Sequence, residues 1–210
     1  AVLHHHQRLD GSGFPRRPRM SGPPRALEGR EIHIFTRIIG VADVFEKARR
    51  PVNGGGLVVP TVRALRQTLG HVRAGRLDPV VFRALLSVVP AFAPGSVVKL
   101  NDERSYVVTG WHAGRPCRPI VAEVAPDDLG LDQTETALGE PIDLRIRPDL
   151  WIVGAEGQNI TADLFEESAP GEFDLRMPYP NGLVEPPPAP LEDRLWPIDL
   201  SANDRHRQAG

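Results

Sequence analysis

The chain has 210 residues, of which 40% are hydrophobic and 25% are charged, and its formal net charge at pH 7 is -2. This length and apolar content predict a buried core in one or two domains. No apolar run approaches the roughly 20 residues that a membrane-spanning helix needs, and no signal peptide opens the chain. The single cysteine, Cys117, excludes an intrachain disulfide framework and favours a reducing compartment, so we expect a soluble, cytoplasmic protein.

Charge is distributed unevenly along the chain. Residues 1–93 contain 15 basic and 6 acidic residues, whereas residues 94–210 contain 10 basic and 21 acidic residues. A basic region favours an anionic partner, such as a nucleotide with phosphate groups. Solvation of a loop and binding to nucleic acid are consistent with the same sign of charge, so charge alone does not choose among these functions.

Histidines, a carboxylate and glycines gather at residues 4–15. Imidazole nitrogens and carboxylate oxygens bind Zn, Fe, Ni or Mn, so His5, His6 and Asp10 are candidate ligands by residue type. Because adjacent side chains diverge, we expect His5 and His6 to serve two ions, or one ion and one substrate phosphate. A tag remnant or a solvated histidine cluster would look the same, and Asp10-Gly11 also fits an ordinary turn.

Two blocks of sequence resemble a known family. Residues 5–15, His-His-Gln-Arg-Leu-Asp-Gly-Ser-Gly-Phe-Pro, resemble the HD-GYP signature His-His-Glu-x-x-Asp-Gly-x-Gly-Tyr-Pro. Residues 37–46, Arg-Ile-Ile-Gly-Val-Ala-Asp-Val-Phe-Glu, resemble the block that follows it in the same family. The resemblance covers about residues 1–92 and only the second half of such a domain. It implies a helical, metal-dependent phosphodiesterase domain that hydrolyses the bacterial second messenger cyclic di-GMP.

The resemblance also implies roles for individual residues. The expected ligands of a divalent transition metal, Fe or Mn, are His5, His6 and Asp43. The expected substrate-binding residues are the turn that shapes the pocket and an arginine that contacts a substrate phosphate, namely Asp10, Gly11, Gly13, Phe14, Pro15 and Arg50. The other histidines, His33, His71, His112 and His206, have no matching context and are expected to be surface or structural residues.

Several departures from the family alter the expected function. Gln7 stands for the usual Glu, Glu46 for the usual Asp, and no clear equivalent of a second basic contact follows Arg50-Pro51. The His-Asp pair of the family occurs nowhere in the 210 residues, so we expect hydrolysis to need upstream residues and this fragment alone to be inactive. The alternative is a degenerate, non-catalytic module that binds cyclic di-GMP or a partner protein, such as another signalling domain. We expect no nucleic-acid polymer as partner.

An amphipathic helix is predicted from Glu31 to Arg50, because apolar residues recur there at helical spacing. Asp43 interrupts this apolar pattern. A buried carboxylate must be neutralised, hydrogen-bonded or bound to a cation, so Asp43 is a candidate metal ligand. The alternative is an ordinary ion pair with Lys47 or Arg50. The apolar positions are Ile32, Phe35, Ile38, Ile39, Ala42 and Phe45.

Two more helices complete the predicted helical region. Thr61 is expected to cap the first and Asp78-Pro79 to begin the second. Residues 16–30 are expected to form a loop, because proline and glycine punctuate them. This loop is longer than the family's usual connection, which is consistent with a lid over the site or with a tolerated insertion.

After residue 93 the apolar pattern changes to short alternating runs. These predict a small β-barrel-like extension over residues 94–126, an acidic extension with short strands over residues 127–167, and a Pro-rich disordered tail over residues 168–210. The predicted fold class is therefore mainly α, with the second half of an HD-like helical domain in residues 1–93, followed by the β extension and the tail.

Overall fold

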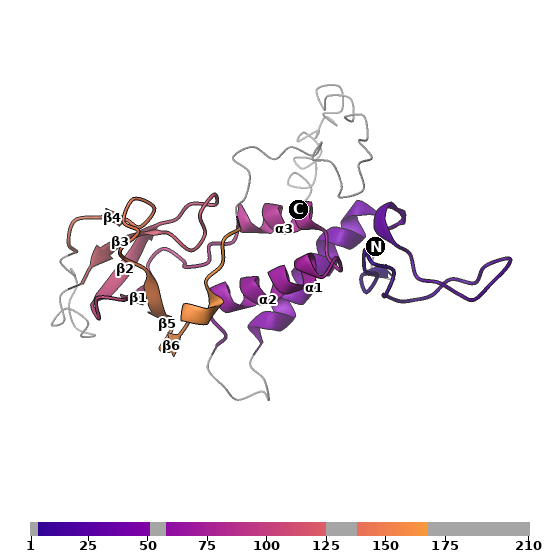
Figure 1. The fold of residues 1–210 in the computed structure, drawn as a ribbon, viewed down its shortest axis with the longest axis horizontal. Helices are drawn as coiled ribbons and strands as arrows, with labels where there is room; N and C mark the ends of the chain where they lie inside the picture. Colours follow the sequence, from indigo (N-terminus) through magenta and orange to yellow (C-terminus); the bar gives the residue numbers. More distant parts are fainter. Residues whose placement is uncertain (1–3, 51–57, 125–137, 168–210) are drawn as a thin grey trace, which may run out of the picture. The chain divides into compact units, whose positions relative to one another are not determined.

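Three helices are followed along the chain by a six-stranded antiparallel sheet (Figure 1). The computed structural model describes residues 4–50, 58–124 and 138–167. The predicted Pro-rich tail, residues 168–210, lies outside the described residues. The helices are α1 (Ile34–Arg49), α2 (Thr61–Arg73) and α3 (Pro79–Leu86). Within the described residues, no helix combines the length and apolar character that crossing a membrane requires.

The starts of the helices follow from local chemistry. At α3, one carboxylate oxygen of Asp78 accepts hydrogen bonds from the backbone N–H groups of Val80 and Val81, and Pro79 supplies a preset backbone angle, so this predicted start is confirmed. At α2, the capping residue is Pro60, which makes no side-chain cap bond. Thr61 is therefore the first helical residue of α2 and not its cap.

Helix α1 forms where it was predicted, but it buries a different face. Phe35 is 62% exposed and Ile38 is 45% exposed, although both were expected to face the core. The buried residues of α1 are Thr36, Gly40 and Val41. Gly40 packs against the N-terminal motif, where a Cβ would lie in ordinary van der Waals contact, 3.4 Å from the carbonyl oxygen of His5. Val44 and Phe45, which are partly buried, also pack against the hydrophobic core, whereas Phe35 and Ile38 stay exposed.

The sheet has the strand order β4-β3-β2-β1-β5-β6, with every neighbouring pair antiparallel. Alternation places Val98, Leu100, Tyr106 and Val108 in the core. The strands are β1 (Val97–Leu100), β2 (Ser105–Gly110), β3 (Ile120–Glu123), β4 (Ile142–Asp143), β5 (Ile152–Ala155) and β6 (Gln158–Asn159).

The sheet shows that the predicted mainly-α class is wrong. Among the described residues, three helices stand beside six strands. The prediction placed a small β unit of its own in residues 94–126, yet β4, β5 and β6 come from the predicted acidic extension and join the same sheet. Two of these strands are only two residues long, which is too short for an alternating pattern to be visible in the sequence.

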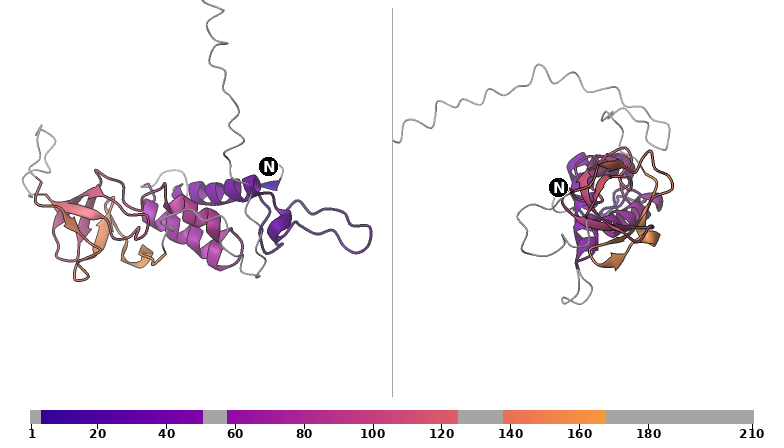
Figure 2. Two further views of the ribbon diagram at one scale, coloured as in Figure 1. Left: turned by 90° about the horizontal axis from the view of Figure 1, so that it is seen from above. Right: turned by 90° about the vertical axis from the view of Figure 1, so that its left-hand side faces the viewer.

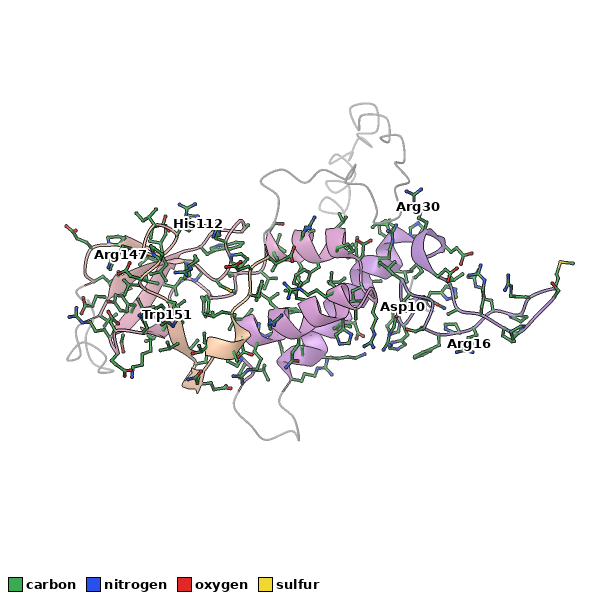
Figure 3. The ribbon with its side chains drawn as sticks, in the orientation of Figure 1. Asp10, Arg16, Arg30, His112, Arg147 and Trp151 are labelled. Carbon is green, nitrogen blue, oxygen red and sulfur yellow. The ribbon has the colours of Figure 1, made fainter. Side chains whose placement is uncertain are left out.

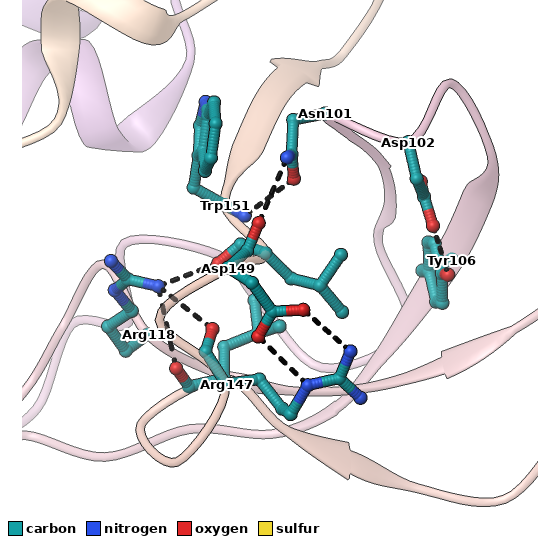
Figure 4. A network of polar contacts seen from close by, with 9 residues as sticks. Asn101, Asp102, Tyr106, Arg118, Arg147, Asp149 and Trp151 are labelled. Atoms are coloured by element: carbon teal, nitrogen blue, oxygen red, sulfur yellow. Dashed lines mark hydrogen bonds and ion pairs between the residues drawn. The ribbon is translucent and has the colours of Figure 1, made fainter.

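Polar side chains hold the segment before β5 against the sheet (Figure 4). Asn101 donates to the carbonyl of Asp149 at 3.0 Å and accepts from the backbone N–H of Trp151 at 2.9 Å. Arg118 donates to the carbonyl of Leu150 at 2.6 Å, and the Tyr106 hydroxyl donates to Asp102 at 2.8 Å. The bonds of Asn101 and Arg118 satisfy backbone groups that lie outside the strand ladder, whereas the bond between Tyr106 and Asp102 joins two side chains.

The guanidinium of Arg63 joins α2 to the end of the sheet through three polar contacts. Arg63 of α2 contacts Asp163 at 2.8 Å, the side chain of Gln158 at 2.7 Å and the carbonyl of Asn159 at 2.8 Å. One hydrophobic cluster also includes residues of all three helices and of the sheet, among them Val62 and Ile152. The two parts therefore share both apolar and polar contacts.

A hairpin leaves the helical part near the N-terminal motif and extends away from the helices (Figure 2). Arg17 and Arg25 pair across it, with each backbone N–H donating to the other residue's carbonyl. Arg25 is also held by ion pairs with Glu28 and Glu31. The predicted loop of residues 16–30 is thus an ordered hairpin at its base.

Candidate metal centre

The N-terminal motif folds into tight consecutive turns. The backbone N–H of Gln7 donates to the carbonyl of His4, and that of Gly11 donates to the carbonyl of Arg8, each at 2.9 Å. Gly13 then passes so close to the first turn that a Cβ would lie 2.4 Å from the carbonyl oxygen of His6. Only glycine fits this approach, which explains why the motif needs glycine at residue 13.

Gln7 holds these turns together from inside. Its side chain is buried, with the amide nitrogen donating to the carbonyl of Pro15 at 2.6 Å. Its amide oxygen accepts from the backbone N–H of Leu27 at 2.9 Å. Gln7 therefore connects the motif to the segment that follows the hairpin. Its amide group supplies the donor and the acceptor that these two bonds require.

The turns bring two histidines to a carboxylate of α1. One ligand atom each from His5, His6 and Asp43 lies within 4.8 Å of the other two. The prediction that the adjacent histidines diverge is wrong, because their ring centroids are only 3.8 Å apart. The ring of Phe14 stacks on His6 at a centroid distance of 4.6 Å, which fixes the orientation of that imidazole.

The donor set fits a divalent transition metal. Two imidazoles and one carboxylate are a combination that binds Fe(II) and related ions and leaves coordination positions open for water or substrate. Burial, followed by the charge effects of His5 and Lys47, lowers the pKa of His6, so its neutral form is favoured. Neutral imidazole is the form that binds a metal ion.

Asp43 also has a cation of its own. The ammonium of Lys47 lies 2.6 Å from one oxygen of the Asp43 carboxylate, one turn further along α1. The ion pair that the sequence offered as an alternative to metal binding is therefore present, and it lies within the same cluster. A bound metal ion would compete with Lys47 for this carboxylate.

The cluster opens into a cavity of about 410 Å³. The lining comes from the N-terminal turns, from α1 and from the end of α2 with the turn after it. Besides the three candidate ligands, the residues that line it include Arg8, Phe14, Lys47, Gln67, His71 and Arg76. This arrangement places imidazole, carboxylate and cationic groups around one solvent-accessible space.

Parts of the chain are similar to known proteins. Residues 1–81 match the family model described as HD domain. The chain is 31% identical over 121 residues to a cyclic di-GMP phosphodiesterase of Pseudomonas aeruginosa, covering 57% of this chain and 26% of that protein. It is 37% identical over 84 residues to 3'3'-cGAMP-specific phosphodiesterase 1 of Vibrio cholerae, covering 39% of this chain and 17% of that protein.

The match over residues 1–81 is therefore a similarity to HD domains, as the HD-GYP resemblance of the sequence implied. A third relative, 3'3'-cGAMP-specific phosphodiesterase 3 of Vibrio cholerae, is 34% identical over 83 residues, which are 39% of this chain and 15% of that protein. The chain spans about a quarter or less of the length of these relatives. No solved structure matches the chain.

Of the substrate-binding residues predicted from the HD-GYP resemblance, Phe14 lines the cavity. Asp10, which is labelled in Figure 3, accepts hydrogen bonds from the backbone N–H and the hydroxyl of Ser12, so its carboxylate stabilises the turn. Gly13 and Pro15 support the turn through the contacts described above, and Gly11 has a positive φ of 72° that glycine adopts without strain.

Arg50 does not line the cavity beside His5, His6 and Asp43. Its side chain is 69% exposed and lies 3.8 Å from Glu46. The segment that follows it, residues 51–57, is outside the described residues. The role of Arg50 in binding phosphate remains a prediction from the family resemblance.

Three residues that line the cavity were not predicted from the sequence, namely Arg8, His71 and Arg76. His71 was expected to be a surface or structural residue, but it faces the site from the last turn of α2. Two other histidines lie elsewhere: His33 caps α1 by accepting from Phe35, and His112 lies 3.7 Å from Asp143 of β4 (Figure 3). Only the four-residue spacing of Gln67 and His71 pointed to a shared helix face.

Proposed function

We propose that this chain supplies part of the active site of a metal-dependent phosphodiesterase that hydrolyses a cyclic dinucleotide, with cyclic di-GMP as the expected substrate. The observation that carries the proposal is the meeting of His5, His6 and Asp43 within 4.8 Å at a cavity of about 410 Å³. The names of the relatives support the substrate class, since one acts on cyclic di-GMP and two on 3'3'-cGAMP.

The described residues have distinct tasks in this proposal. His5, His6 and Asp43 hold the metal ion, for which Fe or Mn is expected. A metal ion bound there would lower the pKa of a coordinated water toward neutrality and neutralise charge on phosphate oxygens. Phe14 keeps His6 in its orientation, and Gln7 ties the turn that carries His5 and His6 to Pro15 and Leu27. No nucleophilic side chain is needed.

Metal binding and turnover test the proposal separately. Mn²⁺ and Fe²⁺ binding to the chain is measured by equilibrium dialysis with metal analysis, for the wild type and for H6A and D43N variants. We expect both variants to lose most of the bound metal, whereas H33A, which changes a histidine outside the cluster, keeps it. Retention of metal by both H6A and D43N would refute the ligand set.

Hydrolysis is measured by chromatography of cyclic di-GMP and 3'3'-cGAMP after incubation with metal-loaded protein. Because the family's His-Asp pair is absent from these 210 residues, we expect turnover to require the upstream half of the domain. If a longer protein that contains this half binds metal but leaves both nucleotides intact, the proposed phosphodiesterase activity is refuted.

A second candidate is a non-catalytic module that binds a cyclic dinucleotide or a partner signalling domain. The ion pair between Lys47 and Asp43 favours it, because an ammonium already occupies the carboxylate that a metal would need. Nucleotide binding without bound metal would support this candidate. It would then be the Lys47 ammonium, rather than a metal ion, that contributes positive charge beside Asp43.

A further inference from the structure

Two arginines of the cavity come from segments far apart in the sequence. Arg8 lies in the N-terminal turns and Arg76 lies in the turn after α2, and both are exposed at the cavity that contains the metal-ligand cluster. Within the described part of the chain, neither guanidinium has a carboxylate within ion-pair distance. Lys47, in contrast, forms an ion pair with Asp43 at 2.6 Å.

The backbone fixes the two arginines relative to each other. The backbone N–H of Leu9, the residue after Arg8, donates to the carbonyl of Arg76 at 3.0 Å. The N–H of Arg76 in turn donates to the carbonyl of His71 at 3.0 Å, and Gly75 makes the turn possible with a φ of 71°. The two side chains are therefore anchored on adjoining backbone segments.

The electrostatic effects on neighbouring groups agree with this placement. Burial, then the charges of Arg76 and Arg8, lower the pKa of His71. Both arginines also act to lower the pKa of Asp10, whose largest lowering effect comes from its hydrogen bonds with Ser12. The Oδ1 atom of Asp10 already accepts hydrogen bonds from the backbone N–H and the hydroxyl of Ser12.

We propose that Arg8 and Arg76 form a second phosphate-binding subsite of the cavity, which holds the phosphate of a cyclic dinucleotide that is not at His5, His6 and Asp43. The inference rests on the proposed function and adds the residues that orient the substrate. Guanidinium groups suit this task because they donate paired hydrogen bonds to phosphate oxygens. The subsite supplies the basic contact that Arg50, outside the cavity lining, does not make there.

Binding measurements on the full chain test the subsite. The probes are Mn²⁺ alone and cyclic di-GMP in the presence of Mn²⁺, with dissociation constants from isothermal titration calorimetry. The variants are R8Q/R76Q, which removes both charges, and R8K/R76K, which keeps them. The matched control is R73Q, because Arg73 is an exposed arginine in the last turn of α2 that does not line the cavity.

We expect R8Q/R76Q to weaken cyclic di-GMP binding about tenfold or more, as the loss of charge-assisted hydrogen bonds implies. Mn²⁺ binding should change less than twofold, R8K/R76K should recover part of the nucleotide affinity, and R73Q should match the wild type. Thermal unfolding of each variant checks that the fold is retained.

Three results would overturn the subsite alone. The first is a nucleotide affinity of R8Q/R76Q that matches the wild type. The second is a loss of Mn²⁺ affinity in R8Q/R76Q as large as its loss of nucleotide affinity. The third is an R8K/R76K variant that is folded but binds the nucleotide no better than R8Q/R76Q. If the metal-loaded wild type binds neither cyclic di-GMP nor 3'3'-cGAMP, the proposed function fails together with the subsite. The wild-type titration therefore separates the two failures.

Discussion

The Nζ atom of Lys47 lies 2.6 Å from Oδ2 of Asp43, so the metal-ligand cluster contains its own competing cation. The Lys47 side chain is 53% exposed and that of Asp43 28% exposed, which limits the strength of the pair to about 1 kcal/mol. Metal binding at Asp43 has to overcome this attraction.

Replacing Lys47 by Met should therefore strengthen Mn²⁺ binding, by up to about fivefold. Equilibrium dialysis against Mn²⁺ measures the change. Lys99→Met is the matched control, because Lys99 forms a similar ion pair with Glu103 four residues away but lies in β1, outside the cavity. Weaker Mn²⁺ binding by K47M would show that Lys47 supports the metal site instead of competing with it.

Gln7→Leu should destabilise the protein by about 2 kcal/mol or more. The substitution removes both amide bonds and leaves the Pro15 carbonyl and the Leu27 N–H without their partner in the motif. Urea unfolding followed by circular dichroism gives the change in free energy. Gln67→Leu is the control, since Gln67 is exposed, and it should shift the free energy of unfolding by less than about 0.5 kcal/mol. Equal stability of the two variants would contradict the bracing role of Gln7.

Asp78→Ala should be among the most damaging single substitutions in the helical part, at about 3 kcal/mol or more. Asp78 is buried, caps α3 and forms an ion pair with Arg37 of α1 at 2.8 Å. Asp78→Asn should cost less, because an amide oxygen can still cap the helix. Chemical denaturation of both variants measures the difference, with Asp149→Ala as the control at an exposed ion pair. An effect of D78A no larger than that of D149A would refute this linkage of α1 to α3.

Cys117 should be unreactive in the folded protein. Burial raises the pKa of its thiol to about 11, and its sulfur accepts a hydrogen bond from the backbone N–H of Phe165 at 3.5 Å. At pH 8 only about a thousandth of the thiol would be ionised. Titration with a disulfide reagent should therefore be slow in buffer and fast in 8 M urea. Rapid reaction of the native protein at pH 8 would contradict the burial of this group.

Local chemistry made part of the fold predictable. The pair Asp78-Pro79 marked the start of α3, because both residues act within one turn of the helix. The apolar period located α1 but not its buried face, since Phe35 and Ile38 carry the stronger apolar signal while Gly40 packs against the N-terminal motif. The short β4 pairs with β3 much earlier in the sequence, whereas β6 pairs with the adjacent β5. With two residues each, both strands are too short to show an alternating pattern.

The site likewise contains residues that the sequence made predictable and residues that it did not. The family resemblance brought together His5, His6 and Asp43, and the structure places them in one cluster. Arg76 stayed hidden because its place at the cavity depends on a backbone bond to Leu9, 67 positions earlier in the chain. Such a contact leaves no trace in spacing or periodicity.

The ion pair between Arg63 and Asp163 has a consequence for folding during synthesis of the chain. The two residues are separated by 100 positions, so α2 is synthesised long before its partner emerges from the ribosome. Until then the Arg63 guanidinium has neither Asp163 nor Gln158 to bind, and the junction of helices and sheet cannot close. The growing chain thus completes this junction only once β6 and the residues after it have been added, which makes it a late step of folding during translation.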